Sequence, residues 1–151
     1  MKDLISVIIT TRNRKFKVER AIKSVINQSY KNIEIIVVDD FSSDDTFKYL
    51  NNNFPDLKIL SNKKNLGGSA SRNIGVKNSK GKFIAFLDDD DYFEFNKIKI
   101  QYELMIKNEK LTLITSSYTT FSESSEKKSI NYNRKINNGL YFKNIYGGTS
   151  T

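Results

Sequence analysis

"IEIIVVDDFSSDDT", residues 33–46, joins a short apolar run to an acidic turn and then to the start of a helical pattern. Its first six residues are mostly β-branched and almost continuously apolar, which is typical of a strand buried on both faces. Similar runs recur as "LISVIIT" (4–10), "LKIL" (57–60) and "FIAFL" (83–87). Strands of this kind belong to parallel sheets that helices cover on both sides.

Helical patterns occupy the segments between these runs. Residues 42–54 begin with Ser42 or Ser43 as a capping residue and end before Pro55. Residues 67–78 and 95–106 follow the third and fourth apolar runs. In residues 16–27 the apolar positions recur at helical spacing, at Val18, Ala21, Ile22 and Val25. This alternation predicts an α/β domain with a mostly parallel sheet and right-handed crossovers.

The composition limits the class of protein. A chain of 151 residues fits one domain with a real core, and we expect it to span 1–118, followed by a polar, loop-like segment and an incomplete second region over 119–151. The absence of cysteine and histidine excludes disulfides, Ser-His-Asp triads and most zinc sites. No apolar run approaches the roughly 20 residues of a membrane span, and because Asp3 follows Met1 so closely we do not expect these first residues to act as a secretory signal.

The net charge of +8 comes from lysines that are scattered along the chain. This pattern, without interleaved stacking aromatics, does not favour nucleic-acid binding. It is compatible with weak attraction to anionic phosphates or to an anionic membrane face. We therefore expect a cytoplasmic protein that can associate peripherally with the inner membrane face.

Polar clusters follow each of the four predicted strands. They are "TTRNR" (10–14), "DDFSSDD" (39–45), "SNKKNLGGSASRN" (61–73) and "DDDD" (88–91). In parallel α/β sheets, ligands bind beyond the carboxyl ends of the strands. Polar loops without a function would be scattered over both ends of the sheet, so these clusters predict a ligand site at one edge.

The first two clusters suit a nucleoside. The Asp40 carboxylate can accept the ring N–H of a base such as uracil, whereas Asp39 is interpreted as a turn residue. Thr10 or Thr11 can offer a hydroxyl to the base or ribose, or can simply end its strand.

The third cluster suits a diphosphate. Gly67 and Gly68 allow close approach of the backbone to a ligand, and the helix that begins there has free N–H groups suited to phosphate. Arg72, one turn into this helix, can reach back with its fixed fork of donors, although it could also be an ordinary surface arginine.

The acidic run Asp88 to Asp91 needs compensation for its charge. Two unit charges about 4 Å apart repel by about 4 kcal/mol at an effective dielectric constant of about 20. Hard carboxylate oxygens in this pattern suit Mg²⁺ or Mn²⁺ held jointly with phosphates. An EF-hand is excluded because Phe93 and Lys99 stand where glycine and glutamate are required. Neither a Walker A loop nor a GxGxxG fingerprint is present.

Together, "SVIITTRNR", "IEIIVVDDFSSDDT" and "NLGGSASRNIGVKNSKGKFIAFLDDDDYF" resemble the successive motifs of family 2 glycosyltransferases, which are inverting enzymes with the Rossmann-like GT-A fold. The resemblance covers about residues 4–110. It implies transfer of a sugar from a nucleotide-diphosphate sugar, usually a UDP-sugar, to a hydroxyl acceptor on a glycan or lipid carrier, as in polysaccharide synthesis. It also implies Mn²⁺ or Mg²⁺ as cofactor.

The resemblance assigns roles to individual residues. Asp88 and Asp90 are the outer aspartates of a DxD motif that meets the ribose and the divalent ion, with Asp90 the stronger metal ligand and Asp91 in support. Nucleotide-sugar binding is assigned to Thr10, Arg12, Asp40, Arg72, Asp88 and Asp89. Phe41 departs from the family, which often has a small residue after the paired aspartates, and Asp89 replaces the usual small middle residue.

The family's acceptor-binding half, with the carboxylate that acts as general base, has no counterpart in these 151 residues. We therefore expect a truncated or unusually short chain that binds donor, is inactive alone and self-associates through uncovered apolar surface. A non-catalytic nucleotide-binding module is the alternative. A sugar-nucleotide pyrophosphorylase would need a glycine-rich phosphate loop near the amino terminus, which is missing.

Overall fold

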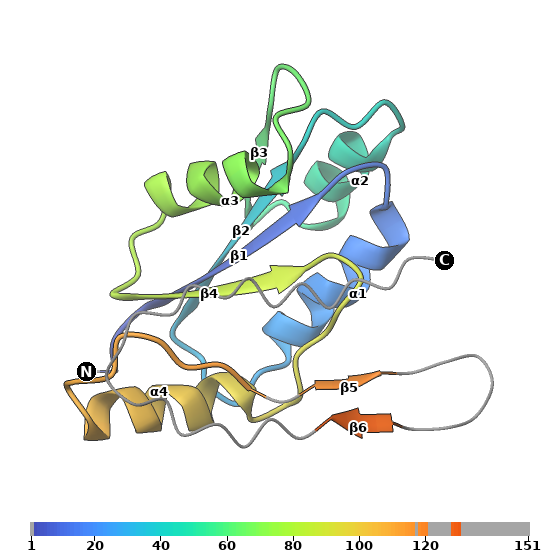
Figure 1. Ribbon diagram of the computed structural model, residues 1–151. Helices are drawn as coiled ribbons and strands as arrows, with labels where there is room; N and C mark the ends of the chain where they lie inside the picture. The colour runs from blue at the N-terminus through green and yellow to red at the C-terminus, as the bar shows by residue number, and fades with distance from the viewer. Residues whose placement is uncertain (1, 117, 121–127, 131–151) are drawn as a thin grey trace. The chain divides into compact units, whose positions relative to one another are not determined.

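The computed structural model describes residues 2–116, 118–120 and 128–130. The chain forms two compact units, residues 1–112 and 113–151. The first unit alternates strands and helices along the chain (Figure 1). Its elements are β1 (Ile5–Thr11), α1 (Lys15–Ile26), β2 (Ile33–Asp39), α2 (Thr46–Asn53), β3 (Lys58–Ser61), α3 (Gly68–Lys77), β4 (Phe83–Asp88) and α4 (Lys97–Lys107). The predicted α/β class is confirmed.

The four strands form one parallel sheet in the order β3-β2-β1-β4. In the register of this sheet, Thr11 lies beside Asp39 and Thr10 beside Asp88. The order reverses between β1 and β4, because β2 and β3 extend the sheet to one side of β1 and β4 lies on the other. Ligands of open α/β sheets bind at such a reversal, beyond the carboxyl ends of the strands.

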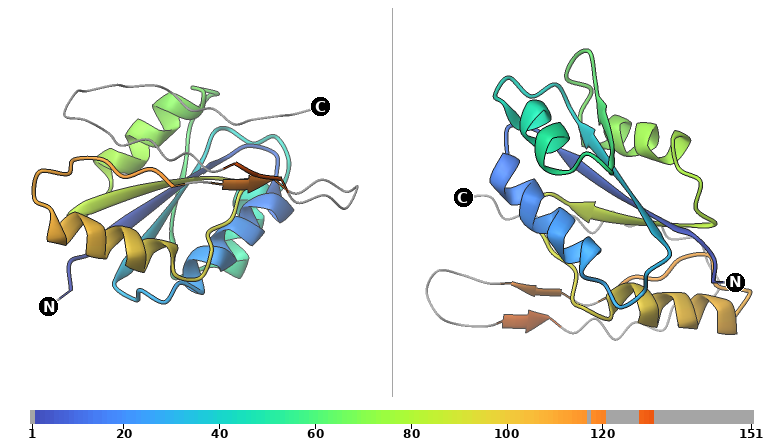
Figure 2. Two further views of the ribbon diagram at one scale, coloured as in Figure 1. Left: turned by 60° about the horizontal axis from the view of Figure 1, so that its bottom comes forward. Right: turned by 180° about the vertical axis from the view of Figure 1, so that it is seen from behind.

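Helices cover both faces of the sheet (Figures 1 and 2). One face of the sheet packs on α1, α2 and α4, and the core there includes Val7, Ile22, Leu50 and Ile98. The other face packs on α3, where a Cβ at Gly75 would overlap the side chain of Ile8. Glycine at this position therefore lets α3 lie close against β1, which holds the start of the helix beside the ends of the strands.

The helix α2 begins later in the chain than the two residues that were predicted to cap it, Ser42 and Ser43. α2 starts at Thr46, and neither Ser42 nor Ser43 caps it. The Ser42 hydroxyl instead donates to the Asp39 carboxylate, and the Thr46 N–H donates to Asp44 Oδ1 at 2.9 Å. Ser42 was a wrong choice because a carboxylate three residues earlier competes for its hydroxyl.

The second unit contains two short strands, β5 (Tyr118–Thr120) and β6 (Lys128–Ile130). They pair antiparallel, with Thr119 opposite Ser129. These two short strands lie in the segment that was expected to be loop-like, and for the rest of that segment the expectation stays a prediction. The functional boundary at residue 118 stays a prediction. No helix among the described residues is both long and apolar enough to cross a bilayer.

Candidate functional site

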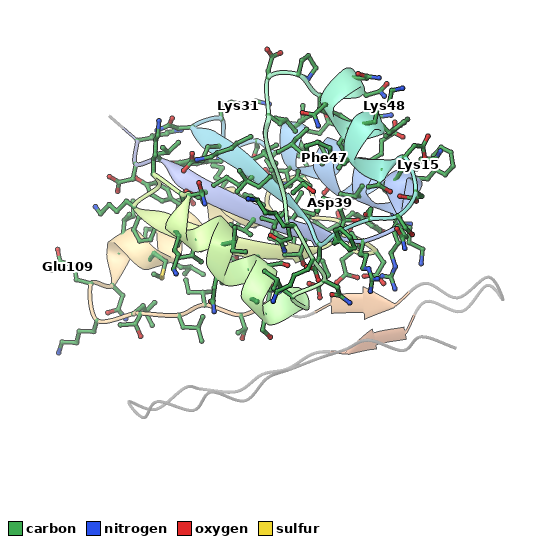
Figure 3. The ribbon with its side chains drawn as sticks, turned by 90° about the horizontal axis from the view of Figure 1, so that it is seen from above. Lys15, Lys31, Asp39, Phe47, Lys48 and Glu109 are labelled. Carbon is green, nitrogen blue, oxygen red and sulfur yellow. The ribbon has the colours of Figure 1, made fainter. Side chains whose placement is uncertain are left out.

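The polar clusters gather at one edge of the sheet, because the strands that precede them are parallel and in register. The helix α1 begins at this edge with Lys15, whereas Glu109 lies at the opposite end of the unit (Figure 3). The sequence-predicted residues of the first unit therefore share one end of the fold. These residues fall into two groups. Some face solvent, and others form contacts that hold the loops together.

Two loops at this edge are tied to one another. Asp39 is buried and accepts hydrogen bonds from the N–H and the hydroxyl of Ser42, the former at 3.2 Å. The Ser42 hydroxyl accepts the N–H of Asn13 at 2.9 Å, and Asn13 Oδ1 accepts the N–H of Ser43 at 2.7 Å. Asp39 thus organises the turn after β2, as predicted, and fixes the loop after β1.

Thr10 and Arg12 remain available to a ligand. Thr10 is half-buried and Arg12 is exposed. Within residues 2–116 neither side chain forms a hydrogen bond or an ion pair. Thr11, the alternative to Thr10, is buried and donates its hydroxyl to Asp89 Oδ2 at 2.8 Å. Of the two threonines, Thr10 is the one whose hydroxyl can meet a nucleoside.

Asp40 is buried and holds the loop between β3 and α3. Its Oδ1 accepts from Asn62 Nδ2 and from the N–H of Leu66, both at 2.8 Å. Its Oδ2 accepts the N–H of Gly67 at 2.7 Å. Burial by itself raises the pKa of Asp40, but hydrogen bonds from Leu66, Asn62 and Gly67 outweigh it and the pKa is lowered. The Ser71 hydroxyl is a fourth hydrogen-bond partner that lowers the pKa of this buried carboxylate, so protein groups account for its about four acceptor positions.

The start of α3 has the geometry expected of a phosphate site. Gly67 has a φ of +83°, which favours glycine, and no side chain caps the helix. The Arg72 guanidinium folds back over Gly68, since a Cβ there would lie 3.3 Å from Arg72 Nη1. Arg72 also pairs with the Asp88 carboxylate. A positive guanidinium therefore stands beside free N–H groups at the reversal point of the sheet.

The acidic run is partly neutralised by arginines of the protein. Arg14 Nη1 lies 3.0 Å from Asp89 Oδ1 and 3.2 Å from Asp90 Oδ2. Asp88 pairs with Arg72, and Arg20 donates to the backbone carbonyl of Asp90. These arginines therefore supply part of the charge compensation that the acidic run needs.

Asp89 differs from its neighbours in burial. Its side chain is 7% exposed, and its carboxylate contacts Thr11 and Arg14. Burial raises the pKa of Asp89, and the Thr11 hydroxyl and the Arg14 charge oppose this change. In this arrangement the protein occupies both oxygens of Asp89. Its assigned contact with the nucleotide-sugar stays a prediction.

The two outer aspartates, Asp88 and Asp90, are the candidates for holding a divalent ion. The side chains of Asp88 and Asp90 are 47% and 48% exposed, so both can offer hard oxygens to a ligand. Among the described residues no group of three or more acidic side chains forms a ready-made metal site. Mg²⁺ commonly takes only one or two carboxylates and completes its shell with water and substrate phosphates.

Arg14 was not identified from the sequence. "TTRNR" contains two arginines, and the pattern alone gives no reason to prefer Arg14 over Arg12. Only the fold shows that Arg14, at the N-cap position of α1, lies beside aspartates 75 residues further along the chain.

We expect Arg14→Gln to destabilise the protein by about 1–3 kcal/mol, because the buried Asp89 loses its cationic partner. The loss should shrink as the pH falls from 7 toward 5. Without Arg14 the pKa of Asp89 rises further, the folded state binds a proton more readily than the unfolded state, and stability therefore decreases with rising pH. Urea unfolding at several pH values measures this. The control is Lys15→Gln, which breaks a pair with the exposed Asp45; equal losses in both variants would contradict the prediction.

Comparison with known proteins gives consistent matches. A family model described as Glycosyl transferase family 2 matches residues 6–151. An uncharacterised glycosyltransferase of Rickettsia conorii is 41% identical over 143 residues, which are 94% of this chain and 23% of that protein. A UDP-Glc:alpha-D-GlcNAc-diphosphoundecaprenol beta-1,3-glucosyltransferase of Escherichia coli is 34% identical, over 89% of this chain and 56% of its own length. The crystal structure of S. aureus TarS 1–349 in complex with UDP matches with a TM-score of 0.63 and 28% identity, over 69% of this chain and 32% of that one.

Proposed function

The chain belongs to glycosyltransferase family 2, and we propose that its first unit binds the nucleotide-diphosphate part of a sugar donor, a UDP-sugar. The whole protein then transfers the sugar to a hydroxyl acceptor with inversion, in glycan or polysaccharide synthesis. Because the chain spans only 23% and 56% of the two relatives described above, its activity beyond family membership is part of this proposal.

One observation carries the proposal. Thr10 and Asp88 pair at the carboxyl ends of β1 and β4, and Arg72, which contacts Asp88, folds back over the start of α3. The carboxylates of Asp88 and Asp90 are half-exposed at this edge of the sheet, and within residues 2–116 the Thr10 hydroxyl forms no hydrogen bond. Each element of a metal-bound nucleoside diphosphate finds a chemically matched group there. Carboxylates hold the cation, and N–H groups and arginine meet the phosphates.

The proposed roles follow from these contacts. Thr10 and Asp40 meet the nucleoside, with Arg12 nearby, and Arg72 meets the diphosphate. Asp88 and Asp90 hold Mn²⁺ or Mg²⁺, which when bound neutralises the charge of the leaving diphosphate. Arg72 adds positive charge at the same place, and it must release Asp88 at least in part to do so.

The acceptor is proposed to be a glycan or a lipid-linked sugar. The Escherichia coli relative is named for a diphosphoundecaprenol-linked acceptor, and a lipid carrier would bring the protein to a membrane face. The side chains of Ile84 and Phe86 on β4 are 39% and 50% exposed, which supports the proposed self-association. That the 151 residues do not transfer sugar by themselves stays a prediction.

Calorimetric titration of the 151-residue chain with UDP, GDP, ADP and CDP, each with and without Mn²⁺, tests the proposed function. We expect UDP to bind most tightly, and to bind at least about tenfold more tightly with Mn²⁺ present, because the cation relieves repulsion between the diphosphate and the aspartates. A chain that bound none of the four nucleotides would contradict the proposal. Binding unchanged by excess chelator would contradict its metal part.

A further inference from the structure

Two strained backbone positions lie in the two loops that Asp39 ties together. Asn13 has a φ of 54° and Phe41 a φ of 59°, and no other non-glycine residue in the described part of the chain has a positive φ. Asparagine often adopts this left-handed conformation, but a bulky residue such as phenylalanine rarely does. The conformation of Phe41 therefore needs a cause.

The neighbours of Phe41 supply the mechanical cause. The N–H of Asp40 donates to the carbonyl of Thr11 at 2.8 Å, and the N–H of Ser42 donates to Asp39 at 3.2 Å. Phe41 is thus held between two residues whose backbones are fixed by other elements. Strained backbone conformations that are held in place by their surroundings in this way are found preferentially at ligand sites.

The ring of Phe41 has no partner that would explain it as a core residue. Phe41 is 49% exposed, and within the described residues it makes no aromatic or cation–π contact. Other exposed phenylalanines, such as Phe16 and Phe95, have ordinary negative φ angles. Phe41 alone among them combines an exposed ring, a strained backbone and a place at the ligand-binding edge of the sheet.

We propose that the ring of Phe41 is a surface on which the nucleobase of the donor stacks. This inference rests on the proposed function, and it adds a residue that determines base affinity. Phe41 directly follows Asp40, the residue that is proposed to contact the nucleoside. Every base has a flat π face, so an exposed aromatic ring beside a polar edge contact suits it. A glycine or serine at this position could not provide such a face.

Titration of the 151-residue chain with UDP and with pyrophosphate, both in the presence of Mn²⁺, tests this proposal. The variant Phe41→Asn removes the ring but keeps a residue that tolerates a positive φ. We expect this variant to bind UDP on the order of tenfold more weakly and to bind pyrophosphate as tightly as the wild type does. Its melting temperature should be the same as that of the wild type or higher. Phe41→Tyr should retain UDP affinity, and Phe95→Asn is the matched control with an exposed ring elsewhere.

The outcomes separate this inference from the function on which it rests. If the wild type binds UDP and Phe41→Asn binds it equally well, the stacking role is wrong and the proposed function stands. If Phe41→Asn weakens UDP and pyrophosphate alike, the ring acts on the loop and not on the base, which also overturns the stacking role. If the wild type binds no nucleoside diphosphate, the proposed function fails and the stacking role fails with it.

Discussion

Asp40→Ala is expected to lower the free energy of unfolding by about 3–5 kcal/mol, because it removes a buried carboxylate that accepts from three donors, of which the Gly67 N–H keeps only its contact with Asn65 Oδ1. Two of these donors are backbone N–H groups, of Leu66 and Gly67, directly before α3. The loop should shift and carry Arg72 away from Asp88. UDP and pyrophosphate should then both bind more weakly, whereas loss of a base contact alone would affect only UDP.

Urea unfolding compares this variant with Asp56→Ala, which removes an exposed carboxylate away from the site. Asp40→Asn is the second variant, because asparagine keeps the shape of the aspartate side chain but places its NH₂ group, a donor, opposite one of the three N–H donors. The pKa of Asp40 is lowered in the folded protein, so its contribution is present above pH about 4 and is lost as the pH falls through the folded pKa. A loss below about 1 kcal/mol in Asp40→Ala would show that the loop does not depend on this carboxylate.

Asp90→Asn is expected to remove most of the increase in UDP affinity that Mn²⁺ produces. The side chain of Asp90 is half-exposed, and its carboxylate contacts only the exposed guanidinium of Arg14 among the described side chains. A cation carrying two charges can displace that contact at little cost. The substitution should leave stability almost unchanged, which separates it from Asp40→Ala.

Glu94→Gln is the matched control for the charge of this segment. Glu94 is exposed, lies four residues beyond Asp90, and makes no side-chain hydrogen bond or ion pair with the described residues. In calorimetric titrations with UDP at increasing Mn²⁺ concentration, the UDP affinity of Glu94→Gln should rise as in the wild type, whereas that of Asp90→Asn should rise only weakly. If Mn²⁺ changed the UDP affinity of both variants equally, the effect of Mn²⁺ would depend on the net charge of the segment and not on Asp90 as a metal ligand.

The sequence predicted the class of fold because the relevant signals are local. Continuous apolar runs with helical patterns between them give a parallel sheet, and polar residues after each run then meet at one edge. Within the first unit, the strand and helix boundaries agree with the structure to within a few residues, apart from the capping residue of α2, whereas β5 and β6 were not predicted. The collection of Thr10, Asp40, Arg72 and the acidic run at this edge was also predictable, since it follows from strand direction alone.

The tertiary structure decided which polar groups are free and which are committed. Nothing local distinguishes Asp89 from Asp88 and Asp90, yet Asp89 is buried by a threonine and an arginine more than 70 residues away in sequence. Asp40 is likewise satisfied by a loop more than 20 residues downstream. The strain at Phe41 also depends on hydrogen bonds between separate loops. The sequence by itself therefore determined the fold and the edge of the sheet at which the polar clusters meet. Long-range packing decided which acidic groups are buried, which ion pairs form, and the direction in which the pKa values of Asp40 and Asp89 shift.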